Sequence, residues 1–261
     1  MHDGAAATDV VRCEVLEDGA LWHVVLATPK ANIIDSAKIA ALQGIFERAR
    51  DARDLKAILI EGDGPHFSFG ASIDEHMPER CAAMLASLHA MLKALLAANV
   101  VCMAAVRGQC LGGGLEIVSL CQRVFAAHDA KLGQPEIVLG VFAPVASISL
   151  PERVGRAVAL DLLSTGRSMA ADEALQCGLV DAVVDDPRAA AIEYVRRHLA
   201  PKSAASLRFA VRAARHEFGA RFAREIDALE HIYLSELMRT ADAVEGLTAF
   251  TQKRAPKWRN A

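Results

Sequence analysis

Residues 101–117, VCMAAVRGQCLGGGLEI, constrain the fold more than any other part of the chain. The first six are apolar and predict a short buried strand. Gly112, Gly113 and Gly114 then stand where a helix would begin, so the first backbone N–H groups of that helix are free of side chains. Such a helix start can hold an oxyanion, and Glu116 lies in its first turn. The stretch therefore predicts a strand, a tight turn and a polar site.

A simpler interpretation of the same residues remains open. Glycines between a strand and a helix can form only a tight turn, and a glutamate in a first turn can be only a partner of the helix dipole. Two other glycine-rich motifs are excluded. No Lys-Ser/Thr pair follows the glycines as in a phosphate loop, and the G-x-G-x-x-G spacing of a dinucleotide site is missing.

Length and composition narrow the class of protein. A chain of 261 residues suits one sizeable domain, or one domain with an appendage. The net charge of −3 gives no electrostatic footprint for nucleic acid. The six cysteines have no C-x-x-C spacing and indicate reduced thiols in a cytosolic protein. We expect no membrane partner, because no 18-residue span is free of charge, and the N-terminus does not have the pattern of a signal peptide.

Local patterns predict the order of the elements. Residues 1–10 are expected to be a loose tail, Pro29 to start a turn, and Asp35 or Ser36 to cap a helix. Strands are expected at 11–16 and 21–26 as a hairpin, then at 55–61, 101–106 and 124–127. Helices are expected at 37–52, 79–98, 113 to 120 or 123, 156–164 and 188–198, with a helix closed at Gly178 and then a strand within 168–184.

The C-terminal region from residue 203 is expected to be entirely helical. It carries an apolar stripe that must be buried, either against this domain or against a neighbouring subunit. The stripe consists of Phe218, Phe222, Ile226, Leu229 and Ile232.

The pattern A-x-V-x-G-x-x-x-G-G-G-x-E, which ends at Glu116, resembles the signature of the crotonase (enoyl-CoA hydratase/isomerase) superfamily. The resemblance implies an α/β fold, with a ββα spiral core over residues 1–200 and a C-terminal helical oligomerisation region over 201–261. It further implies a homotrimer or a dimer of trimers. The substrate would be an acyl-CoA thioester, so coenzyme A arrives with the substrate. No further cofactor and no metal is implied.

Residues 66–76, HFSFGASIDEH, resemble the F-x-x-G-x-D loop of that family. The resemblance implies that the backbone N–H groups of Ala71 and Gly113 form the oxyanion hole. Ser72 stands where the family usually has Asp, which puts the anchoring of the loop and the substrate subtype in question. His76, with the two acidic residues before it, is interpreted as a polar helix start rather than as a catalytic group.

Residues 133–140 resemble the G-Q-P-E-x-x-x-G segment of hydratases in the superfamily, which makes Glu136 the second catalytic carboxylate. Alone, a glutamate after a proline is an ordinary first-turn acid. Its pairing with Glu116 indicates hydration. The two would hold one water between them, with Glu116 activating the water and Glu136 donating a proton, although the sequence leaves the two roles interchangeable.

The resemblance also implies positions that contact coenzyme A. Lys30 and Ala31 lie in a P-K-x-N segment whose backbone lines this site in the family, and the 66–76 loop adds Ser68 and Ile73. The tail AFTQKRAPKW matches residues that approach the coenzyme A of a neighbouring subunit, Phe250 and Lys253. Lys253 could equally be a solvated charge.

Residues 142–146, FAPVA, replace a glycine-rich run that borders the acyl pocket in relatives. With the 66–76 loop, they make the chain look most like hydratases of cyclohexa-1,5-diene-1-carbonyl-CoA in anaerobic aromatic degradation. The expected product is 6-hydroxycyclohex-1-ene-1-carbonyl-CoA. The alternatives are hydration of open-chain 2-enoyl-CoA, another crotonase reaction and a non-catalytic acyl-CoA-binding protein. A serine peptidase is disfavoured because no G-x-S-x-G motif is found.

Overall fold

The computed structural model describes residues 10–28 and 30–261. The tail expected over residues 1–10 lies outside the described residues except for Val10, and so does the turn expected at Pro29. Within the described part, the predicted α/β fold is confirmed: two sheets, a surrounding layer of helices and a helical C-terminal region.

The larger sheet has six strands in the order β1-β2-β3-β4-β6-β9. The predicted hairpin is confirmed, since β1 and β2 pair antiparallel with Leu16 opposite Leu21, around the 3-10 turn η1 (Glu17–Gly19). All other neighbours in this sheet are parallel. The strands are β1 (Val11–Leu16), β2 (Leu21–Leu26), β3 (Ala57–Gly62), β4 (Val101–Val106), β6 (Arg123–Ala126) and β9 (Ala182–Val183).

The smaller sheet contains β5 (Gln109–Leu111), β7 (Lys131–Gly133) and β8 (Ser168–Ala170). The chain leaves β4 at Val106, turns at Gly108 and enters β5 at the next residue, Gln109. The prediction that a helix begins at residue 168 is wrong. Residues 168–170 form strand β8, and the helix, α5, spans only Ala171–Gln176. A three-residue strand that pairs with a distant segment leaves no local pattern, so the sequence could not reveal it.

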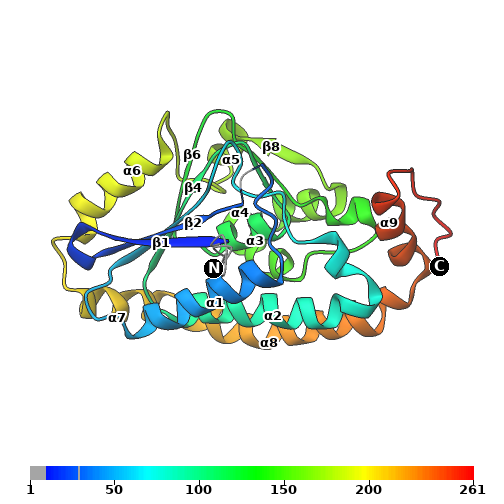
Figure 1. The fold of residues 1–261 in the computed structure, drawn as a ribbon, viewed down its shortest axis with the longest axis horizontal. Coiled ribbons are helices and arrows are strands. Elements are labelled where there is room, and N and C mark those ends of the chain that lie inside the picture. The colour runs from blue at the N-terminus through cyan, green and yellow to red at the C-terminus, as the bar shows by residue number, and fades with distance from the viewer. Residues whose placement is uncertain (1–9, 29) are drawn as a thin grey trace, which may run out of the picture.

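Three long helices cover one face of the larger sheet and run alongside one another (Figure 1). They are α1 (Ser36–Asp51), α2 (Pro78–Ala97) and α8 (His216–Ser235). Of the two candidate caps for α1, Asp35 is the N-cap, since its side chain accepts a hydrogen bond from Lys38 N at 2.9 Å. The methionines and leucines predicted on one face of α2 are buried in the main core.

The opposite face of the larger sheet is covered by α6 (Pro187–Tyr194), the π-helical turn η4 (Val195–Leu199) and α7 (Ala204–Ala214). Alternation along the strands divides the core between the two faces. In β3, Ile58 and Ile60 belong to the cluster beneath α1 and α2, while Leu59 belongs to the cluster beneath α6. Both faces of the central strands are therefore buried, as their continuous apolar runs require.

The remaining elements surround the end of the sheet where β4 gives way to β5. They are η2 (Ile73–His76), α3 (Gly113–Ser119), η3 (Pro135–Leu139), α4 (Pro144–Thr165), η5 (Leu237–Arg239) and α9 (Ala241–Thr251). Helix α4 begins twelve residues before the helix expected at residue 156, and Gly155 at φ 76° marks a kink within it. The C-terminal region is not helical to its end, because no helix is present over residues 252–261.

The apolar stripe of α8 packs against this chain's own α2 and α4, with Phe222 and Ile226 fully buried. Of the two predicted alternatives, the stripe is therefore buried against this domain. Ile232, at the end of the stripe, stays 39% exposed. Helix α2 is long and apolar enough to cross a membrane by length and composition alone. Because core helices of soluble proteins pass the same test, and α2 packs between α1 and α8, its composition is explained by the fold.

Candidate active site

The loop that carries Ala71 is fixed by its backbone. Ile34 N donates to Gly70 O at 2.9 Å and Ser72 N donates to Ile34 O at 3.1 Å. In this parallel bridge the N–H of Ala71, between the two bonded groups, points away from Ile34. The Ser68 hydroxyl secures the loop from below, since it donates to Asn32 O at 2.8 Å and accepts from Gly70 N at 3.0 Å.

The glycine run brings the start of α3 against that loop. Gly112 has a φ of 52°, which a residue with a side chain rarely adopts. A Cβ on Gly113 would lie 3.3 Å from Ala71 N, and a Cβ on Gly114 would lie 2.8 Å from the Ser68 Cβ. The glycines are therefore required for close backbone approach, beyond any role in a turn.

Two backbone donors consequently lie next to each other. Gly113 is the first residue of α3, so its N–H has no acceptor within the helix. Over residues 10–28 and 30–261, neither this N–H nor that of Ala71 has a hydrogen-bond acceptor. Two unpaired donors beside a helix N-terminus can stabilise an oxygen that gains negative charge during a reaction.

Glu116 lies on the buried α3 and is only 4% exposed. Its Oε1 accepts a hydrogen bond from Ala146 N at 3.1 Å, at the N-terminus of α4. Burial raises the pKa of Glu116 to about 7, although the backbone N–H groups of Ala146 and Val145 favour the carboxylate and lower the pKa.

Glu136 lies on η3, and its carboxyl group faces the glycine run. A Cβ on Gly112 would be 2.7 Å from Glu136 Oε1. The Gln134 side chain donates to the same Oε1 at 3.1 Å, while Oε2 is buried and has no partner among the described residues. Burial, and next the charge of Glu116, raise the pKa of Glu136 to about 8.

The two carboxyl groups therefore interact inside the protein. The charge of Glu116 disfavours a second charge on Glu136. Glu116 receives two backbone N–H donors from the start of α4, whereas Glu136 receives its own backbone N–H and the Gln134 amide. Near neutral pH, we expect the pair to hold one proton, mainly on Glu136. Such a pair offers one base and one acid beside the two backbone donors.

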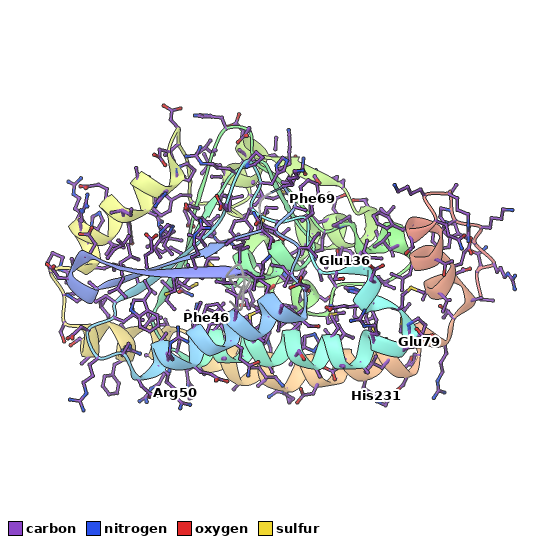
Figure 2. All side chains as sticks on the ribbon, in the orientation of Figure 1. Phe46, Arg50, Phe69, Glu79, Glu136 and His231 are labelled. Carbon is purple, nitrogen blue, oxygen red and sulfur yellow. The ribbon has the colours of Figure 1, made fainter. Side chains whose placement is uncertain are left out.

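A cleft of about 650 Å³ opens onto Ala71, Gly112 and Glu136, whereas Gly113 and Glu116 are not among its lining residues. Figure 2 labels two of the residues that line it, Glu136 and Phe69. The walls are mostly apolar, and the only carboxylates among the lining residues are Glu136 and Asp74. The lining comes from the 31–33 segment, the 69–76 loop, the glycine run, η3 and α9: Ala31, Ile33, Phe69, Gly70, Ala71, Ser72, Ile73, Asp74, His76, Leu111, Gly112, Pro135, Glu136, Leu139, Val141, Phe250 and Thr251.

Of the residues expected to contact coenzyme A, three line the cleft: Ala31, Ile73 and Phe250. Ser68 is fully buried beneath the loop, where it anchors Asn32 and Gly70.

Two lysines expected to contact coenzyme A do not line the cleft. Lys30 is exposed beside Ala31, with a φ of 95°. Lys253 is exposed after the end of α9.

The two departures from the family pattern have local consequences. Ser72 anchors the loop through its backbone, since its carbonyl also accepts a hydrogen bond from His76 Nδ1 at 2.7 Å. The loop is held further by Glu75, whose carboxylate accepts from Ser36 N and from the Ser36 hydroxyl.

The 142–146 segment starts α4 and supplies the backbone donors to Glu116. Phe142 turns towards α8, where its ring packs on Tyr233.

Sequence reasoning missed three groups near the glutamates: the Gln134 amide, the Ala146 N–H and the Tyr233 phenol. Gln134 stands inside the G-Q-P-E motif, so its position before Glu136 was an available signal. The other two come from helices that lie 30 and 117 residues beyond Glu116, and no local pattern connects them to it.

Comparisons with known proteins place the chain among acyl-CoA enzymes. The profile of a family described as enoyl-CoA hydratase/isomerase matches residues 17–261. A cyclohexa-1,5-dienecarbonyl-CoA hydratase of Thauera aromatica is 53% identical over 93% of this chain and 94% of its own length. A probable enoyl-CoA hydratase of Mycobacterium bovis is 34% identical, over 94% and 96% respectively. The crystal structure of an enoyl-CoA hydratase/isomerase from Pseudoalteromonas atlantica superposes with a TM-score of 0.84 at 26% identity, covering 95% and 99%.

Proposed function

Because the chain belongs to the enoyl-CoA hydratase/isomerase family, we propose that it is a hydro-lyase that adds water to a cyclic dienoyl-CoA thioester. Family membership confirms the resemblance inferred from the motif that ends at Glu116. The observation that supports hydration most strongly is the interacting glutamate pair beside two backbone donors that have no acceptor among the described residues.

The substrate proposal is cyclohexa-1,5-diene-1-carbonyl-CoA. It is supported by the 53% identity to the Thauera aromatica hydratase of that name, which extends over nearly the whole of both chains. A mostly apolar cleft next to the oxyanion donors is compatible with an uncharged, flat ring. Coenzyme A would enter with the substrate, and Ala31, Ile73 and Phe250 are positioned to line its path.

In the proposed mechanism, the thioester carbonyl oxygen accepts hydrogen bonds from Ala71 N–H and Gly113 N–H. These donors stabilise the negative charge that develops on the oxygen as water attacks. Loss of one such donor typically costs about 10²–10³ in rate, although ordinary substitutions cannot delete a backbone N–H.

The two glutamates handle the protons. Glu116, the more acidic of the two, removes a proton from the water while its oxygen bonds to the β carbon. Glu136, which keeps its proton near neutral pH, delivers it to carbon. Water thus supplies the hydroxyl group, and the proton lost to Glu116 replaces the one given by Glu136, so the enzyme ends each turnover with one shared proton.

For the cyclic diene the addition is 1,4. The hydroxyl group bonds to the β carbon, the proton bonds to the far end of the diene, and the remaining double bond moves between them. The product is 6-hydroxycyclohex-1-ene-1-carbonyl-CoA. Addition to an open-chain 2-enoyl-CoA would instead place the proton on the α carbon, so the position of the new C–H bond separates the two reactions.

The test is a turnover assay that offers cyclohexa-1,5-diene-1-carbonyl-CoA and crotonyl-CoA to the purified protein, with Glu116→Gln and Glu136→Gln as controls. Fast hydration of the diene, slow hydration of crotonyl-CoA and collapse of both rates in the variants would support the proposal. Preference for crotonyl-CoA would contradict the substrate. No turnover of either would favour another reaction of the family or a binding role.

We further propose a cytoplasmic homotrimer or dimer of trimers, in which residues 201–261 are the oligomerisation region. Two side chains of the last helices support this because they remain exposed, Phe250 at 55% and Phe209 at 63%. Light scattering on the full chain distinguishes the states, and a monomer at assay concentration would contradict the proposal.

A further inference from the structure

Tyr233, in the last turn of α8, is a large polar side chain that the proposed mechanism does not use. It is 1% exposed and belongs to the main core. Its hydroxyl group is buried and has no hydrogen-bond partner among the described residues. Native proteins seldom leave a buried hydroxyl unpaired, because the lost hydration is not repaid. A buried hydroxyl in this position therefore points to a partner that arrives with water or substrate.

The Tyr233 ring lies against the 141–146 segment, whose backbone is hydrogen-bonded to both glutamates. It packs on Phe142, with ring centroids 5.2 Å apart and an interplanar angle of 58°. On one side of Phe142, Val141 N donates to Glu136 O, and on the other side Ala146 N donates to Glu116 Oε1. Tyr233 thus packs on the residue between these two attachments.

The electrostatic environment of the phenol agrees with this placement. Burial raises the pKa of Tyr233 far above its ordinary value, and the charges of Cys81, Glu136 and Glu116 raise it further. The hydroxyl group therefore keeps its proton throughout the neutral range and remains a hydrogen-bond donor.

Glu136 has an unpaired atom of the complementary kind. Its Oε1 lies beside the Gly112 backbone and accepts from Gln134, whereas its Oε2 is buried without a partner. Tyr233 and Glu136 both contact the 141–142 segment, so a donor and an acceptor that lack partners among the described residues can be satisfied together by a single bridging water.

We propose that Tyr233 is a positioning residue, whose hydroxyl group donates through one bound water to Glu136 Oε2. This bond keeps Oε1 directed at the cleft and stabilises the carboxylate that remains after proton donation. The inference rests on the proposed function, because it assigns Tyr233 to the proton donor of that reaction.

The test uses the fact that the chain has only two tyrosines, Tyr194 and Tyr233. In Tyr233→Phe, the loss of a hydrogen bond to a charged group should lower kcat roughly 10- to 100-fold while KM changes less than about 2-fold. The denaturation midpoint should not fall, because the substitution removes a hydroxyl that has no protein partner. Tyr194→Phe, on α6 and far from the cleft, is the matched control and should change neither. An unchanged kcat would overturn the proposed role. A fall in kcat accompanied by a fall in the denaturation midpoint would also overturn it.

Nuclear magnetic resonance gives a second readout that does not depend on turnover. With tyrosine labelled at the ring carbon bearing the hydroxyl, each signal is assigned by its disappearance in one Tyr→Phe variant. Glu136→Gln should shift the Tyr233 signal and leave the Tyr194 signal in place. A stationary Tyr233 signal overturns the inference. If the wild type hydrates neither substrate but the Tyr233 signal still moves, the proposed function fails while the contact stands.

Discussion

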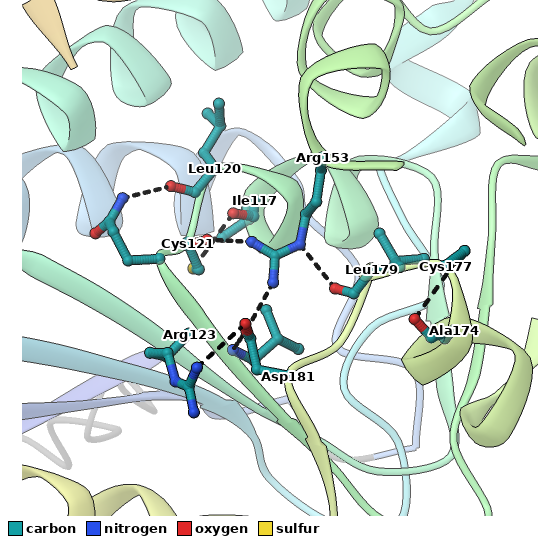
Figure 3. A network of polar contacts seen from close by, with 11 residues as sticks. Ile117, Leu120, Cys121, Arg123, Arg153, Ala174, Cys177, Leu179 and Asp181 are labelled. Carbon is teal, nitrogen blue, oxygen red and sulfur yellow. Dashed lines mark hydrogen bonds and ion pairs between the residues drawn. The ribbon is translucent and has the colours of Figure 1, made fainter. Parts of the chain in front are cut away.

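Two regions of this molecule treat their partly buried charged groups in opposite ways. In the first, Arg153 and Asp181 satisfy each other and the backbone (Figure 3). The Arg153 guanidinium donates to Cys121 O, Leu179 O and Asp181 Oδ2, and Asp181 also accepts from Val124 N. In the second, Glu116 is buried and Glu136 is half-buried, the charge of Glu116 disfavours a charge on Glu136, and Glu136 Oε2 has no partner among the described residues.

The difference separates groups that stabilise the fold from groups that are kept for a reaction. The Arg153 network joins the end of α3, the middle of α4 and the approach to β9, and each of its bonds is made within the chain. The glutamate pair costs stability in the free protein, because a buried carboxyl group with incomplete bonding is disfavoured when charged. We therefore expect substitutions in the two regions to have opposite effects on stability and on activity.

The largest expected effect is on turnover at the glutamate pair. Glu136→Gln and Glu116→Gln should each lower kcat by about 10²–10⁴, since each removes a proton donor or acceptor. A suitable control is Glu79→Gln at the start of α2, an exposed glutamate that is not among the residues lining the cleft, which should leave kcat unchanged. Wild-type turnover in either glutamate variant would contradict the claim that the glutamate pair, unlike the Arg153 network, serves the reaction.

At the paired region the expected effect is on stability. Arg153→Met leaves Asp181 without its main partner and should lower the free energy of unfolding by about 3 kcal/mol in urea titrations. Turnover per folded molecule should stay close to that of the wild type. Arg167→Met is the matched control, because its ion pairs with Asp161 and Glu173 are exposed, and it should cost less than about 1 kcal/mol. Equal losses in both variants would contradict the proposed structural role.

The pH dependence of stability tests the cost of the buried pair. Because the folded-state pKa of Glu136 is raised to about 8 from an ordinary 4.5, the folded protein binds more protons than the unfolded chain between these values. This contribution to stability is fully present below the unfolded pKa and is lost as pH rises through the folded pKa.

Glutamine does not titrate, so Glu136→Gln should gain stability relative to the wild type between about pH 5 and pH 9, by at most about 5 kcal/mol for a shift of this size. Urea unfolding at several pH values measures this gain. A difference between the two proteins that does not change with pH would show that Glu136 is ionised normally in the folded state.

The smallest expected effect concerns the exposed tail. Lys253→Ala should raise KM for the acyl-CoA roughly 2- to 5-fold at low salt and leave kcat unchanged, because an exposed lysine contributes only a screened attraction to phosphate groups. Initial rates at two salt concentrations measure the change. An unaltered KM at low salt would identify Lys253 as a solvated charge, the other interpretation of its position.

Part of the site was predictable from local sequence. The 112–114 glycines, Glu116 and Glu136 stand in short motifs. The spacing within each motif predicts the local backbone conformation, which depends only on neighbouring residues. The hairpin, α1, α2 and the central strands followed from apolar periodicity for the same reason.

The rest depends on contacts between distant segments. Strand β8 exists because it pairs with β7, and α4 starts at Pro144, where its first N–H groups meet Glu116. Tyr233 meets Phe142 only because α8 packs against α2 and α4. No periodicity within a short window carries that information.

Infrared spectroscopy tests the central claim most directly, by asking whether the glutamate pair holds one proton near neutral pH. We predict that the wild type, at about pH 7.5, shows the carbonyl stretch of a protonated carboxylic acid, since ordinary carboxyl groups are fully ionised there. The band should lose most of its intensity in Glu136→Gln, where only Glu116 with its pKa of about 7 can still contribute, and should remain at full intensity in Glu79→Gln. Absence of the band in the wild type, or its persistence at full intensity in Glu136→Gln, would contradict the account.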